Sequence, residues 1–176
     1  MDLKMKTFSK HIYFLVLTFI FLEVSAQEKI TVLKNSKTAK HINIPKTKIF
    51  LIPPMGYTMA TGFIGLQKNE TSIMQVMTGG NYFTDAASLS KKRFEGEGAK
   101  VFEEKILKIN NYHAKFFCVQ DDSLYKNNMM AFGDSTVSLL FFVKYPVKDL
   151  KIEKQIKESL FSIVYDKTFI IEEKKK

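Results

Sequence analysis

Short runs of alternating hydrophobic and polar residues, separated by turn-forming pairs, dominate the chain after residue 48. This alternation is typical of β-strands, because successive side chains of a strand point to opposite faces of the sheet. Two of the separating pairs, Asn110-Asn111 and Gly133-Asp134, favour the tight turns of β-hairpins. The pattern predicts strands over 49–52, 63–68, 72–78, 101–109, 112–120, 129–132 and 137–145. Strands joined by hairpins form an antiparallel sheet.

Two segments have helical spacing instead. Residues 84–98 repeat hydrophobic positions at helical intervals and end near two glycines. Residues 148–162 form the clearer amphipathic helix, with Ile152, Ile156 and Leu160 on one face and charged residues elsewhere. Two such helices can cover the faces of an antiparallel sheet. The predicted fold class is therefore α+β, an antiparallel sheet flanked by helices.

The two ends of the chain lack this regular pattern. We predict a flexible N-terminal arm over 27–48, with one short strand at 30–33. A single domain is expected over 49–166, where an apolar patch at 163–165 closes the sheet, followed by a charged C-terminal tail over 167–176. The length after residue 26 is sufficient for one hydrophobic core.

The first 26 residues differ from everything that follows. Three lysines precede an apolar run over 12–22, and the small pair Ser25-Ala26 comes shortly afterwards. These features are typical of a secretory signal peptide over 1–26. We predict an exported protein, periplasmic or extracellular, whose mature form has no transmembrane segment. The rival interpretation is a retained membrane anchor, which needs about 20 apolar residues, whereas Glu23 ends this run early.

The chain is basic, and the charge persists after the predicted cleavage. Lys and Arg number 27 against 18 Asp and Glu, a formal net charge of +9. Three of the basic and two of the acidic residues precede residue 27, which leaves +8. The lysines are dispersed, and an exported protein seldom meets nucleic acid, so no nucleic-acid partner is expected. Weak association with an anionic membrane surface would use this excess charge.

Four short motifs follow one another through the predicted domain. A Pro-Pro-Met-Gly-Tyr turn follows the first strand, a Gly-Leu-Gln hairpin comes next, Ile-Asn-Asn-Tyr forms a later turn, and Lys-Glu-Ser-Leu ends the last helix. They occupy 50–57, 65–76, 108–114 and 157–163. Together they resemble the Mog1p/PsbP-like proteins, which include DcrB-like bacterial domains. Asn111 replaces the usual glycine, and asparagine also adopts the left-handed conformation. The resemblance implies an α/β/α sandwich with a binding or accessory role.

Motifs for catalysis and metal binding are missing from the sequence. After residue 26 there are two histidines, His41 and His113, and one cysteine, Cys118, without the spacing of a zinc site. We therefore predict neither a metal nor a cofactor. Cys118 lies in an apolar run and is interpreted as a buried core residue that forms no intramolecular disulfide. No nucleophile elbow or phosphate-binding loop occurs in the sequence.

The predicted function is a non-enzymatic accessory or binding protein, whose partner is an unknown protein or envelope component. Methionine and aromatic side chains near strand ends mark partner surfaces when they are exposed, and core filling is the competing interpretation. The candidates are Tyr57, Met59, Phe63, Tyr82 and Phe83. Two alternatives stay open. One is a binder of anionic membrane surfaces, and the other is a small hydrolase-type enzyme with a carboxylate pair chosen from Glu95, Glu97, Glu103 and Glu104.

Overall fold

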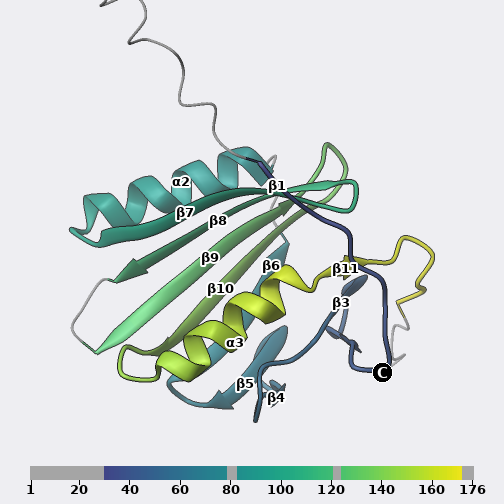
Figure 1. Ribbon diagram of the computed structural model, residues 1–176, viewed down its shortest axis with the longest axis horizontal. Helices are drawn as coiled ribbons and strands as arrows, with labels where there is room; N and C mark the ends of the chain where they lie inside the picture. Colours follow the sequence, from purple (N-terminus) through teal and green to yellow (C-terminus); the bar gives the residue numbers. More distant parts are fainter. Residues whose placement is uncertain (1–29, 79–82, 121–123, 172–176) are drawn as a thin grey trace, which may run out of the picture.

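A mixed eight-stranded sheet forms the centre of the computed structural model, which describes residues 30–78, 83–120 and 124–171 (Figure 1). Its strands are β1 (Thr31–Leu33), β4 (Thr58–Met59), β5 (Gly65–Asn69), β6 (Ser72–Thr78), β7 (Lys100–Ile109), β8 (Tyr112–Gln120), β9 (Tyr125–Gly133) and β10 (Ser138–Pro146). They follow the order β1-β7-β8-β9-β10-β6-β5-β4. All neighbours are antiparallel except β1, which runs parallel to β7. The predicted α+β class is confirmed.

Two helices and a small second sheet complete the described fold. The helices are α2 (Phe83–Gly96) and α3 (Leu150–Phe161), and the small sheet has the order β11-β3-β2, with bounds Val164–Tyr165, Ile49–Leu51 and Ile42–Asn43. The helix α3 and the small sheet pack on one face of the large sheet. The helix α2 packs on the opposite face, against β8, β9 and β10. Among the described residues, no helix is long and apolar enough to cross a membrane.

The predicted hairpins form where the sequence places them. The pair Asn110-Asn111 joins β7 to β8, Ile109 lies opposite Tyr112, and Asn110 has a positive φ of 54°. Asparagine adopts this left-handed geometry more readily than most residues, which is why such a pair makes a tight turn. Both predicted helices also form. The helix α2 ends two residues earlier than expected, and α3 begins two residues later than expected.

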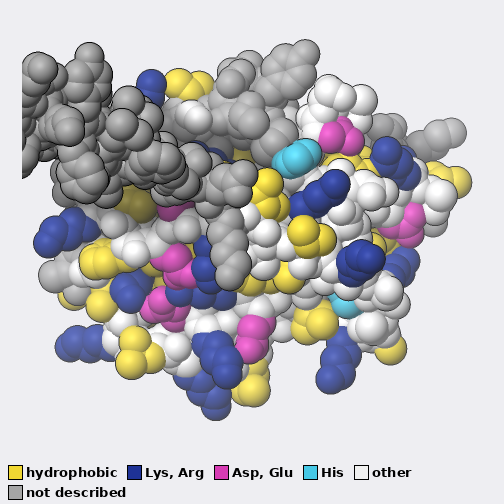
Figure 2. Space-filling model, turned by 45° about the horizontal axis from the view of Figure 1, so that its top comes forward, with side chains coloured by type: hydrophobic (Ala, Val, Ile, Leu, Met, Phe, Trp, Pro, Cys, Tyr) yellow, Lys and Arg dark blue, Asp and Glu magenta, His cyan; other side chains and the backbone are white. Residues whose placement is uncertain are grey.

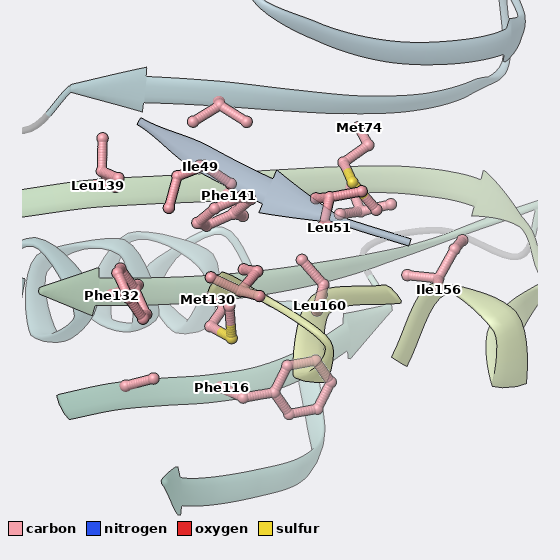
Figure 3. Close-up of a cluster of buried hydrophobic side chains, with 14 of the residues drawn as sticks. Ile49, Leu51, Met74, Phe116, Met130, Phe132, Leu139, Phe141, Ile156 and Leu160 are labelled. Carbon is pink, nitrogen blue, oxygen red and sulfur yellow. The ribbon is translucent and has the colours of Figure 1, made fainter. Parts of the chain in front are cut away.

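The large sheet is buried on both faces at its middle, because adjacent residues contribute to two different cores. Phe116 points toward α3 and the small sheet, whereas Phe117 points toward α2. Figure 3 shows the larger core, in which Ile49 and Leu51 of the small sheet and Leu160 of α3 lie against side chains of the large sheet. Such two-sided burial explains why the middle strands are nearly continuous in hydrophobic residues.

The described part of the predicted flexible arm is held in the fold. The side-chain amide of Asn35 donates hydrogen bonds to the carbonyls of Phe161 (2.7 Å) and Ile163 (3.0 Å), and Ile44 is fully buried. The tail also begins later than predicted, since the ring of Phe169 packs edge-on against Phe50 with centroids 5.0 Å apart. Both corrections have one cause. Single polar or aromatic residues that contact distant parts of the chain leave no periodic pattern in the sequence.

Candidate functional site

The five predicted partner-surface residues do not form one surface. Tyr57 is buried, because the turn after β3 directs it inward: its N–H donates to the Pro54 carbonyl at 3.1 Å, and Gly56 supplies a φ of 80°. Burial raises the pKa of Tyr57 to about 12. Met59 is 38% exposed and Phe63 is half-buried. The remaining two predictions, Tyr82 and the side chain of Phe83, lie outside the described residues.

A groove lies between β7 and α3, and we call it the β7–α3 groove. Its volume is about 480 Å³, and it is lined by Lys105, Leu150, Glu153, Lys154, Lys157, Glu158 and Phe161. Binding sites usually combine a concave shape with a few placed polar groups, and volumes of this order are common among them. The groove therefore replaces the predicted surface as the candidate site.

The periodicity of α3 explains which side chains reach the groove. Ile152, Ile156 and Leu160 lie four residues apart and are buried against the sheet. A helix turns by about 100° per residue, so the positions that follow the first two, Glu153 and Lys157, face sideways. Lys157 contacts Glu103 of β7, and Glu153 contacts Lys126 of β9. The start of the helix is defined by its N-cap Asp149, whose carboxylate accepts a hydrogen bond from the backbone N–H of Ile152 at 2.9 Å.

A chain of alternating charges links β7, α3 and β9 beside the groove, and we call it the charge chain. Its members are Lys105, Glu103, Lys157, Glu153 and Lys126 in that order, and the successive N···O distances are 2.7, 2.6, 2.9 and 2.9 Å. Four of the five side chains are 18 to 27% exposed, and Lys105 at one end is 43% exposed. The charge chain has three lysines and two glutamates. Each end is a lysine that contacts one carboxylate of the chain.

The lysines keep both carboxylates of the charge chain ionised. Partial burial acts to raise the pKa of Glu103 and of Glu153, but hydrogen bonds from lysines outweigh it, and both pKa values lie below 4.5. Burial acts to lower the pKa of Lys157, and its two carboxylate partners raise it overall. A glycosidase-type pair needs one carboxyl group with a raised pKa as the general acid. The arrangement therefore suits charge recognition better than acid catalysis.

The structure does not bring all four candidate carboxylates together: Glu95 and Glu104 share Lys91, whereas Glu97 contacts Arg93 and Glu103 contacts Lys157. Glu103 faces α3, whereas Glu104 faces the α2 side and bonds to Lys91 and Lys115. Glu95 and Glu97 remain near the C-terminal end of α2, at 4.0 and 3.0 Å from basic side chains of the same helix. The carboxylate that does converge with Glu103 is Glu153. Sequence reasoning missed it because a charged residue on an amphipathic helix is normally interpreted as solvated.

A buried polar cluster lies in the same core face as the charge chain. The hydroxyl of Tyr145 donates to Oδ1 of Asn128 at 3.2 Å, and Sγ of Cys118 lies 4.0 Å from that hydroxyl. All three residues are at most 2% exposed, which confirms Cys118 as a core residue. Burial raises the pKa of the Cys118 thiol and favours its protonated form. His113 is exposed, and the strand register places it on the other face of β8.

Apolar side chains lie at both ends of the charge chain. Nζ of Lys105 is 5.6 Å from the ring centroid of Phe161, and Nζ of Lys126 is 5.9 Å from that of Phe102. Phe102 is 58% exposed and Leu150 is 72% exposed. Exposed aromatic and aliphatic groups beside ordered charges are typical of a surface that recognises another protein.

We expect Lys157→Met to lower the free energy of unfolding by about 1–3 kcal/mol near neutral pH, because two partly buried carboxylates lose their shared lysine. The ordinary pKa of these carboxyl groups is 4.5, and it is lowered in the fold. The stabilisation is therefore complete above that value and disappears as the pH falls through the lowered values. Urea unfolding at about pH 7 and about pH 3 should show a large and a small difference from the wild type, respectively.

Lys154→Met is the matched control, because this lysine belongs to the same helix but is 80% exposed. Its effect should stay within about 0.5 kcal/mol at both pH values. Equal losses in the two variants, or a loss in Lys157→Met that persists in acid, would contradict the role assigned to the charge chain.

The candidate site thus combines an open groove, ordered charges and exposed apolar groups. In the described ranges, no cluster of histidine, cysteine or acidic residues has the geometry of a metal site. Comparison with protein-family models and with curated proteins found no match to this chain, so its function has to be argued from the site itself.

Proposed function

We propose that this chain is a non-enzymatic exported accessory protein that binds a partner protein through the β7–α3 groove. The observation that carries the proposal is the combination of a hollow of about 480 Å³ with the charge chain and the exposed Leu150. Ordered charges give orientation and selectivity, and the apolar groups at their ends contribute contact area. The groove offers both within one surface.

Two properties of the sequence support this role. The signal peptide predicted over 1–26 would deliver the chain to the periplasm or beyond. The resemblance to Mog1p/PsbP-like proteins implies an accessory module rather than an enzyme. The order of strands and helices, with α2 and α3 on opposite faces of the sheet, is compatible with the sandwich of that family.

The distribution of charge favours a protein partner over a membrane surface. On the face shown in Figure 2, Lys and Arg side chains lie among acidic and hydrophobic ones and do not form a continuous basic area. At the groove itself, every lysine of the charge chain has a carboxylate within 2.9 Å. Attraction to anionic lipid increases with the number of basic groups near the surface, and paired lysines contribute less to it.

We expect Leu150→Glu to weaken partner binding by about tenfold or more, because the substitution places a charge where an apolar contact is proposed. The test is affinity capture from the native envelope fraction with the protein from Gln27 to Lys176, followed by mass spectrometry at low and high salt. A partner recovered with the wild type and retained in high salt should be lost with the variant.

Ile170→Glu provides the matched control. Ile170 is 81% exposed and lies outside the groove, so the same change in charge there should leave capture intact. Equal capture by both variants would refute the groove as the binding site. Liposome co-sedimentation gives an independent check: a marked preference for anionic over neutral vesicles by the wild type would favour the membrane alternative.

A further inference from the structure

The outer edge of β7 is covered along part of its length. In the part of the chain that the structure describes, β1 pairs only with Leu107–Ile109, and no strand pairs with the outer edge of residues 100–106. Figure 1 shows the short β1 beside one end of the much longer β7. An open strand edge presents backbone N–H and C=O groups that can pair with another chain.

The hydrogen bonds to β1 indicate which backbone groups face outward. The N–H of Asn110 donates to the carbonyl of Leu33 at 2.8 Å across this edge. Outward-pointing groups recur at every second residue of a strand. The backbone N–H and C=O groups of Lys108 therefore also face β1. Those of Ile106 and Glu104 are the next to face outward along the edge. The intervening residue Lys105 directs its backbone groups toward β8.

We propose that an extended segment of the partner protein adds to β7 at Glu104 and Ile106, in line with β1, and places alternate side chains over the β7–α3 groove. This inference rests on the proposed function and specifies how the partner binds. In strand addition, backbone hydrogen bonds supply affinity and pockets for alternate side chains supply selectivity. The groove lies beside this edge, because Lys105 of β7 forms part of its lining.

The free edge is short, and a bulge and charged residues limit which strands can pair with it. The register between β7 and β8 shifts between Val101 and Glu103, so a bulge interrupts the regular edge at that point. The regular free stretch is Glu103–Ile106, and three of its four residues are charged. Bulges and charges on edge strands prevent indiscriminate pairing between sheets. A partner segment therefore has to complement these charges.

The charges of the groove define the chemistry of that segment. Its lining contains three lysines and two glutamates. Lys105 lies at the end of the charge chain, and Lys154 is 80% exposed, with the carboxylate of Glu158 at 3.9 Å. An acidic side chain above the groove would complement these lysines, and an apolar side chain two positions away would reach Leu150 or Phe161. The fitting partner is an extended segment that alternates acidic and apolar residues on one face.

A second copy of the protein fits the edge less well. It would bring the same basic excess of +8 to a groove whose lining already contains three lysines and two glutamates. It would not supply the acidic groups that the groove would accept.

The first test uses the ¹⁵N-labelled protein from Gln27 to Lys176 and a capped heptapeptide, Glu-Thr-Val-Thr-Glu-Thr-Val. Its odd positions share one face of the extended peptide, so glutamate and valine alternate on that face. We expect the amide protons of Glu104 and Ile106 to gain protection from hydrogen exchange when the peptide binds. The amide of Lys105 is the internal control, because it already faces β8 and should not change. A peptide with lysine in place of glutamate should bind about tenfold more weakly or worse, and salt should weaken binding of the acidic peptide.

The second test compares Glu104→Pro with Glu104→Ala. Proline is tolerated on an edge strand where the missing N–H would point outward, and alanine removes the same carboxylate while it keeps the N–H. The expected affinity for the acidic peptide is about tenfold lower in the proline variant than in the alanine variant. Thermal unfolding and the amide spectrum confirm that both variants fold.

The outcomes separate this inference from the proposed function. Equal affinity of the two Glu104 variants, unchanged exchange at Glu104 and Ile106, or no binding of the acidic peptide at about 1 mM would overturn strand addition. If partner capture is lost in Leu150→Glu but kept in Glu104→Pro, the groove binds the partner in another way. If chemical crosslinking or gel filtration shows that the free edge is occupied by a second copy, the inference also fails.

Discussion

Replacement of Phe141 by alanine is expected to reduce the free energy of unfolding by about 3–5 kcal/mol. The side chain is fully buried in the middle of β10, and Figure 3 shows it in the larger core between the large sheet and β3. Alanine removes most of a ring from a close-packed region, and the rigid sheet cannot collapse to fill the space. The free energy of unfolding of a small domain is about 5–15 kcal/mol in total, so this substitution would remove a large fraction of the stability.

Phe102→Ala is the control for this prediction, because Phe102 is 58% exposed on β7. Its loss should change stability by about 0.5 kcal/mol or less. Urea unfolding followed by circular dichroism measures both values. A similar loss in the two variants would mean that the core between the sheet and β3 is looser than the burial of Phe141 implies.

Gly133→Ala is the second substitution with a large expected effect, about 2–6 kcal/mol, since backbone strain and steric overlap add together. Gly133 ends β9 with a φ of 157°, and a Cβ there would lie 1.8 Å from the carbonyl oxygen of Val137. The contact is with backbone, and Asp134 donates its N–H to the same carbonyl at 2.8 Å, so the neighbour cannot move without breaking the turn. The expected result is a destabilised or unfolded protein.

Gly62→Ala tests whether this effect is specific to the site. No atom lies within 4 Å of a Cβ built at Gly62, and its φ is not in the left-handed range. The variant should be as stable as the wild type or slightly more stable, because alanine reduces the conformational freedom of the unfolded chain. Thermal unfolding of the two variants in parallel would reveal the contrast, and comparable midpoints would argue against the close approach at Gly133.

Strand addition to β7 would also explain an otherwise unusual feature of this sheet. Its first strand, β1, is three residues long and is the one parallel neighbour in the described sheet. Among the described residues, no strand pairs with the rest of this side of the ten-residue β7. The unpaired edge and the groove belong to the same region, so one extended ligand could use both.

The candidate site shows how far sequence reasoning reaches for function. The pattern of α3 predicted its buried face correctly, and therefore also which residues lie off that face. It did not predict that Glu103, Glu153 and Lys157 would meet, because they belong to two elements that are about fifty residues apart in sequence. It also treated Tyr57 as a candidate surface residue, whereas the turn at Gly56 directs it into the core.

The sequence by itself determined the local elements: the hairpins at Asn110 and Asp134, the two amphipathic helices and the burial of Cys118. These follow from interactions between neighbours in the chain, whose periodicity and turn preferences can be read directly. Only the tertiary structure decided the parallel position of β1, the anchoring of the N-terminal segment by Asn35, and the charge chain beside the groove. Each of these depends on single contacts between distant residues, and such contacts leave no repeating pattern along the chain.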